Sequence, residues 1–441
     1  MAKPTWRHLV LILASGVLLQ IIFSQPFFGL MDDASNLSQL LPKIQKQGLL
    51  AATLDYLKLD LQWGMFRLTY PSMVYFLYGL GASFGPTVFF LLNAVFVMGI
   101  LYLNAHVFSL ILKIDKWLLL LFMAAFPYTF DLFQHPSLQE KMVMLWGASL
   151  LWACHKKNLT GIIVFAALGF FSKASFCIYI PMGFLTLLSA SQFKIKKDKL
   201  LLGVYILASC SGVLFLAWVA SKGSYTARYS PQNILHNLKS LHGIFFLAIL
   251  SLSFFILIRF KKISQWIPWT GVLSFIVVFL PWHIGAYLQS VIAPTLAALS
   301  LQVAILVFPK KKYWASALGV LAITVTSYRS YGMFTRLRDI KNIVTLAPTL
   351  EQQGVKLIWV PCWEGRGAME YYLKDLAKTK LEVRFLNENT LPTAGPVFFD
   401  GSMCVLPQAV RLDAQCKKTS LYKSKLRKGY ELASFECEKT L

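Results

Sequence analysis

Long apolar runs, separated by short polar stretches, recur from the start of the chain to about residue 328. A helix that crosses a bilayer needs about 20 mainly apolar residues. The pattern predicts about eleven spans, near 8–28, 87–112, 117–130, 138–154, 159–172, 174–190, 200–220, 241–258, 268–282, 290–308 and 313–328. We therefore expect residues 1–328 to form an all-α polytopic membrane domain.

The pattern changes from residue 329 onward, where charges become dense and apolar runs shorten. Strands are predicted at 355–360, 381–386 and 396–399, and a helix at 367–378. Residues 329–441 are therefore expected to form a small α/β domain.

Composition supports a membrane protein, because 56% of residues are hydrophobic and only 14% are charged. A soluble domain carries about 25% charge, and a disordered chain lacks this hydrophobicity. The net charge of +23 comes largely from Lys/Arg clusters beside the apolar runs, which the positive-inside rule explains without a nucleic-acid partner. These clusters are Lys3 and Arg7, 113–116, 156–157, 194–199, 259–262 and 310–312.

Placing every cluster in the cytoplasm fixes the expected topology. The hairpin tips near Lys173 and near His283 to Tyr287 then face outward, as do the loop 29–86 and the domain 329–441. The lysine-rich loops favour a bacterial inner membrane as the location.

The first outer loop opens with Asp32 and Asp33, directly after the first predicted span. Residues 37–50 and 54–66 have apolar positions at helical spacing, which is typical of helices that lie flat at a membrane surface. Asp55 and Asp60 are expected on the solvated face of the second helix. The apolar piece 72–84 is too short for a span and is expected at the outer leaflet.

Cysteines are divided between the two parts of the chain. Four lie in the expected outer domain, where an oxidising environment favours up to two disulfides with three possible pairings. Buried free thiols are the alternative. The four are Cys362, Cys404, Cys416 and Cys437.

The layout resembles the GT-C superfamily of integral-membrane glycosyltransferases, in particular protein O-mannosyltransferases and the lipid A aminoarabinose transferase. The resemblance covers about residues 1–310. It rests on an acidic pair after the first span, interfacial helices, a basic residue before an aromatic Pro segment, a second acidic position and a lysine at a later outer tip. Here these are Asp32-Asp33, Arg67 with Tyr70-Pro71, Asp131 or Glu140, and Lys173.

The resemblance implies sugar transfer from a polyprenyl-phosphate donor to a glycolipid, polysaccharide or protein acceptor outside the cytoplasm, with inversion. Asp32 or Asp33 would serve as general base, and Arg67 and Lys173 would bind the departing phosphate. Tyr70 is a further expected substrate contact. His283 and Tyr287 are the other expected substrate contacts. Family members often have an Arg before a Tyr near this hairpin, and no Arg precedes Tyr287 here. A divalent metal is compatible with this chemistry, but no ligand spacing demands one.

Each residue also has a structural interpretation that the sequence leaves open. Asp32 and Asp33 are good helix caps, Arg67 suits contact with lipid headgroups, and Lys173 suits an ordinary loop tip. A lipid-linked glycan ligase or polymerase is the rival enzyme, and a transporter or flippase is the non-enzymatic rival. A transporter would be expected to show internal repeats or broken helices, which we do not find.

Overall fold

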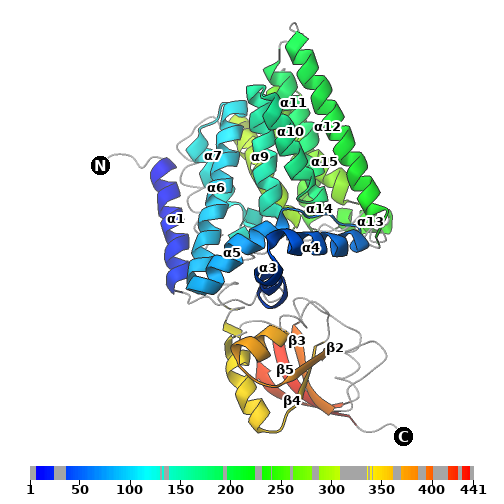
Figure 1. The fold of residues 1–441 in the computed structure, drawn as a ribbon. Helices are drawn as coiled ribbons and strands as arrows, with labels where there is room; N and C mark the ends of the chain where they lie inside the picture. The colour runs from blue at the N-terminus through cyan, green and yellow to red at the C-terminus, as the bar shows by residue number, and fades with distance from the viewer. Residues whose placement is uncertain are drawn as a thin grey trace.

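The computed structural model describes residues 6–23, 36–129, 132–133, 139–191, 196–223, 231–239, 241–258, 262–280, 288–307, 335, 338–339, 341–360, 369–385, 394–400, 416–425 and 430–437. Within them a helical bundle comes first and a β-sheet follows (Figure 1). The long helices are α1 (Trp6–Phe23), α4 (Leu49–Trp63), α5 (Tyr70–Phe84), α6 (Pro86–Leu112), α7 (Lys116–Ala125), α9 (Glu140–Lys156), α10 (Leu159–Phe170), α11 (Tyr179–Ala190), α12 (Lys196–Ala220), α14 (Leu241–Leu257), α15 (Ile267–Phe279) and α16 (Ala293–Val307).

Shorter helical segments join these helices. They are η1 (Asn36–Leu40), α3 (Leu41–Gln47), η2 (Pro127–Thr129), η3 (Ala174–Ile178), α13 (Pro231–Lys239), η5 (Ile263–Trp266) and η6 (Leu288–Ile292). Helix α6 lies inside the bundle and contacts α1, α5, α7, α9 and α16. Its start is set by Gly85, at a φ of 90°, followed by Pro86 in the first turn, where a missing N–H costs nothing.

Three helices of the described chain are long and apolar enough to cross a membrane: Pro86–Leu112, Asp198–Ala220 and Ser290–Val307. The expectation of eleven spans is therefore not met. The other apolar helices of these residues have 10–17 residues, because turns interrupt the apolar runs that the sequence shows as nearly continuous. The last expected span, 313–328, lies outside the described residues.

The two interfacial helices expected in the first loop are present as α3 and α4, separated by Gly48 at a φ of 84°. Figure 1 shows α4 lying across one end of the bundle, and the sheet lies beyond the same end. Leu50, Leu54, Leu59 and Trp63 expose more than half of their surface. Such an apolar face suits a helix that rests on a membrane surface.

Helix α10 connects the two ends of the bundle. At its start, Asn158 caps the helix by accepting from Gly161 N at 3.0 Å. Beside it, Lys157 adopts a left-handed φ of 55° and reaches both carboxylate oxygens of Asp198 at 3.1 Å. At its other end, the turn at 171–173 meets the chain that leaves α4. The turn at Lys173 and the first loop therefore share one end, and Lys157 lies at the other.

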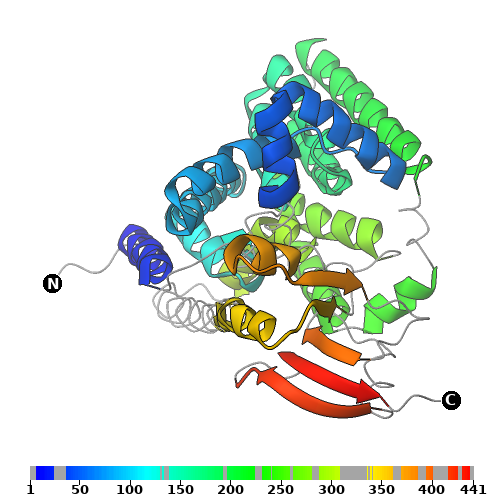
Figure 2. The same cartoon turned by 60° about the horizontal axis from the view of Figure 1, so that its bottom comes forward.

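The C-terminal part contains a five-stranded sheet in the order β2-β1-β3-β5-β4. Its strands are β1 (Leu357–Val360), β2 (Glu382–Phe385), β3 (Ala394–Asp400), β4 (Cys416–Lys423) and β5 (Tyr430–Cys437). Strands β2, β1 and β3 run parallel, and β5 and β4 are added antiparallel. Figure 2 shows the helical residues 341–352 (yellow) and those around η7 (Tyr371–Leu376, orange) lying against this sheet.

The expected strands at 355–360, 381–386 and 396–399 correspond to β1, β2 and β3, and the helix expected at 367–378 appears as the shorter segment around η7. Strands β4 and β5 were not expected. Their register sets Cys416 directly opposite Cys437. Cys362 and Cys404 lie outside the described residues, and no disulfide is present among the side chains that the structure describes.

Candidate functional site

Two loops that carry predicted site residues are hydrogen-bonded to each other at one end of the bundle. Residues 67–69 lead from α4 to α5, and residues 171–173 lead from α10 to η3. Leu68 N donates to Phe171 O at 2.8 Å, and Thr69 Oγ1 lies 2.9 Å from Ser172 Oγ. We call residues 67–69 together with 171–173 the loop junction.

Aromatic rings support the loop junction from the side of α12. Phe66, next to Arg67, contacts Phe171 with ring centres 5.5 Å apart. Both rings also contact Phe215 of α12, at 5.0 and 5.6 Å. Edge-to-face aromatic pairs of this kind add about 0.5–1.5 kcal/mol beyond the area they bury. The packing therefore fixes the backbone from which the side chains of Arg67 and Lys173 extend.

Arg67 forms a two-pronged ion pair with Asp60 of α4. Its Nε donates to Asp60 Oδ2 at 2.8 Å, and its Nη2 donates to Oδ1. The guanidinium also lies over the rings of Tyr56 and Tyr70, with its Cζ 5.3 and 5.7 Å from their centres. Burial disfavours the charged form, but the hydrogen bond to Asp60 and the electrostatic effects of Asp60, Tyr56 and Tyr70 together outweigh it, so the pKa of Arg67 is raised.

The position of Asp60 corrects an expectation from the sequence. Asp60 is 1% exposed, so it does not lie on the solvated face of the interfacial helix. The helical pattern treats an acid as an outward position, but a neighbouring arginine makes an inward carboxylate stable. Asp55 keeps 41% of its side chain exposed, so the same expectation is correct there.

Lys173 forms the second ion pair of the loop junction, with Glu140 at the first turn of α9. Lys173 Nζ donates to Glu140 Oε1. Glu140 is 1% exposed, and its Oε2 is buried with no hydrogen-bond partner among the residues that the structure describes. A buried carboxylate oxygen without a donor is costly.

A further buried contact continues from Glu140. Lys141 is fully buried, and its Nζ donates to Asn93 Oδ1 of α6 at 2.7 Å. Asn93 Nδ2 in turn donates to the carbonyl oxygens of Leu132 and Phe133, at 3.1 and 3.3 Å. Sequence reasoning missed this pair, although Asn93 stands out as an amide within an apolar run. It anchors the segment that follows Asp131.

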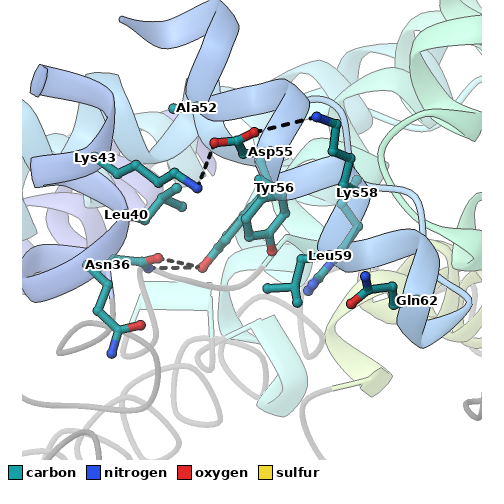
Figure 3. Close-up of a pocket in the computed structure, with 12 residues that line it drawn as sticks. Asn36, Leu40, Lys43, Ala52, Asp55, Tyr56, Lys58, Leu59 and Gln62 are labelled. Carbon is teal, nitrogen blue, oxygen red and sulfur yellow. Dashed lines mark hydrogen bonds and ion pairs between the residues drawn. The ribbon is translucent and has the colours of Figure 1, made fainter. Parts of the chain in front are cut away.

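A pocket of about 600 Å³ opens between α3, α4 and the loop junction (Figure 3). Three cations and three amide side chains contribute to its wall. At one side, Asn36 and Tyr70 exchange hydrogen bonds of 2.9 and 3.1 Å. The lining residues are Asn36, Gln39, Leu40, Lys43, Ala52, Asp55, Tyr56, Lys58, Leu59, Gln62, Arg67 and Tyr70.

The structure thus brings four of the predicted site residues to one end of the bundle. Arg67 and Tyr70 line the pocket, and Lys173 and Glu140 form the ion pair beside it. A buried carboxylate engages each of the two cations, Asp60 for Arg67 and Glu140 for Lys173. The remaining candidates lie outside the described residues: Asp32, Asp33, Asp131, His283 and Tyr287.

No cluster of three or more His, Cys, Asp or Glu side chains that suits a metal occurs in the described part of the chain. The nearby carboxylates, Asp60 and Glu140, are each engaged by a cation. No family model and no curated protein matches the sequence. The resemblance to the GT-C superfamily therefore stays a prediction.

Proposed function

We propose that the protein is a glycosyltransferase that moves a sugar from a polyprenyl-phosphate carrier to a glycan, lipid or protein acceptor. The observation that carries this proposal is the loop junction, which joins the two segments expected to bind the donor phosphate. In this proposal the junction, the pocket and the sheet domain face away from the cytoplasm, across a bacterial inner membrane.

The ion pairs suit this role because they hold the cations in place before a donor arrives. Asp60 uses the Nε and Nη2 edge of Arg67, and Nη1 belongs to the other edge of the same planar group. Guanidinium groups bind phosphate through two parallel N–H groups. Side chains that are already ordered lose less entropy on binding, and fixed cations stabilise a leaving phosphate as its charge develops.

The proton transfer is assigned to the acidic pair at the start of the first loop. Asp32 or Asp33 would accept the proton of the acceptor hydroxyl as it attacks the anomeric carbon. The bond between that carbon and the carrier phosphate breaks with inversion, and the phosphate leaves with the lipid. Asp131, His283 and Tyr287 are proposed to contact the substrates, and a bound divalent metal would add charge neutralisation at the phosphate.

The proposal is tested by donor binding to the purified protein, measured by native mass spectrometry with undecaprenyl-phosphate-linked sugars. The double variant Lys173→Gln with Glu140→Gln removes both charges of the buried pair together, so neither is left unpaired. We expect it to bind the donor at least tenfold more weakly than the unaltered protein, because one charge-assisted hydrogen bond is lost.

Lys222→Gln is the matched control, since Lys222 follows α12 at the same end of the bundle but is exposed and outside the junction. It should bind the donor normally. A double variant that binds the donor as well as the unaltered protein does would contradict the proposal. Equal binding of polyprenol, which lacks the phosphate, would contradict it too.

A further inference from the structure

The rim of the pocket has one carboxylate for two ammonium groups. Asp55 of α4 lies 3.0 Å from Lys43 Nζ of α3 and 3.9 Å from Lys58 Nζ, as Figure 3 shows. Gln47 Nε2 also donates to Asp55, at 3.1 Å. The bonds from Lys43 and Gln47 lower the pKa of Asp55, so this carboxylate is ionised at neutral pH. The rim therefore keeps an excess of one positive charge.

The wall below the rim combines aromatic rings and amides. Tyr56 and Tyr70 lie with ring centres 5.5 Å apart, and Gln39 and Gln62 line the same space. Ring faces cover the apolar face of a sugar, and amides both donate to and accept from hydroxyl groups. A volume of about 600 Å³ falls within the range of small-molecule sites, about 300–1,000 Å³.

We propose that this pocket binds a sugar that carries a negative charge, with the anionic group held by the ammonium groups of Lys43 and Lys58 on their pocket side and the ring beside Tyr56. Asp55 gives the two ammonium groups one negative partner, and the anionic group of the sugar would be the second. An amino sugar would place a third cation against them and is disfavoured. The inference rests on the proposed function only in taking the ligand to be a sugar, because the pocket geometry does not depend on the transfer reaction.

The test uses three sugars that differ mainly in charge: glucuronate, glucose and glucosamine. Binding to the purified full-length protein in phosphatidylcholine nanodiscs is measured by ligand-observed NMR. We expect glucuronate to bind roughly tenfold more tightly than glucose, the size of one charge-assisted contact, and glucosamine to bind most weakly. Equal binding of all three sugars would overturn the proposal.

Lys43→Gln with Lys58→Gln should abolish the preference for glucuronate. Both side chains are exposed, at 44% and 78%, so the fold should persist. Lys46→Gln is the matched control, because Lys46 lies on the same helix as Lys43 but does not line the pocket. Loss of the preference in Lys46→Gln would refute the assignment to this rim.

Two further results separate this inference from its alternatives. If phosphatidylglycerol in the nanodisc displaces glucuronate, a lipid headgroup occupies the pocket and the sugar assignment is wrong; undisturbed binding supports it. A protein that prefers glucuronate yet transfers no sugar from any polyprenyl-phosphate donor would reject the proposed function and retain the pocket. The two claims therefore fail independently.

Discussion

Replacing Asp60 with asparagine removes the charge that balances Arg67 in the loop junction. Asp60 keeps only 2% of its side chain exposed and Arg67 keeps 21%. Breaking a buried ion pair by removing one partner costs about 3–5 kcal/mol, because the other charge stays buried and uncompensated. Because Arg67 is partly exposed, we expect the free energy of unfolding to fall by an amount near the low end of this range, about 3 kcal/mol.

Asp55→Asn is the matched control, since it makes the same chemical change five residues earlier on α4. Asp55 is exposed, and surface ion pairs contribute little to stability. Each kcal/mol shifts the unfolding midpoint of a 150–250-residue domain by about 2–4 °C. For this longer chain we expect the Asp60 variant to melt roughly 5 °C lower, and the Asp55 variant within about 1–2 °C of the unaltered protein.

The measurement is the thermal midpoint of the detergent-solubilised protein, followed by tryptophan fluorescence. Adding Arg67→Gln to Asp60→Asn should recover part of the loss, because no charge is then left without a partner. Equal midpoints for the Asp55 and Asp60 variants would refute the pairing. An additive loss in the double variant would refute it as well.

Two further predictions concern packing and covalent structure. Gly169→Ala should destabilise the protein by about 1–3 kcal/mol, because its new methyl group would overlap the buried ring of Phe176. Gly203→Ala on α12, where no described atom lies within 4 Å of the added methyl group, should be neutral or stabilising in the same melting assay. Cys416 and Cys437, which are opposite in register, should appear as one disulfide-linked peptide in non-reducing mass spectrometry. Cross-strand partners lie about 4.5–5.5 Å apart at Cα, within the range that a disulfide spans, and free thiols at both positions would refute this pairing.

The interfacial helices could be predicted because their signal is local. Apolar residues at helical spacing indicated α3 and α4, and Gly48 separates the two helices. The ion-pair partners could not be predicted in the same way. Glu140 and Lys173 are 33 positions apart, and their contact depends on how α9 and α10 pack. The amphipathic pattern also predicted Asp60 on the exposed face of its helix. Residue spacing alone does not show that Arg67 folds back to pair with it.

Fewer helices long enough to cross a membrane occur in the described residues than the sequence pattern predicted, for a related reason. Hydropathy measures how apolar a stretch is, but a short break in helical geometry hardly changes that average. The turn at 171–173 ends α10 after 12 residues, although the residues on both sides are apolar. Strand β4 was missed because Lys417, Lys418 and Lys423 give it the composition of a surface loop, while its pairing with β5 depends on contacts distant in sequence.

The central claim is transfer of a sugar from a polyprenyl-phosphate donor, with Asp32 or Asp33 as the base. Sugar transfer by purified protein should be measured for the unaltered chain and for Asp32→Asn and Asp33→Asn variants that elute as folded species. Asparagine caps a helix as well as aspartate does but cannot accept the proton. We predict that replacing the base lowers the transfer rate by about 10²–10⁴-fold. Near-normal transfer by both variants would contradict the catalytic assignment, and no transfer by the unaltered protein from any polyprenyl-phosphate sugar would contradict the function itself.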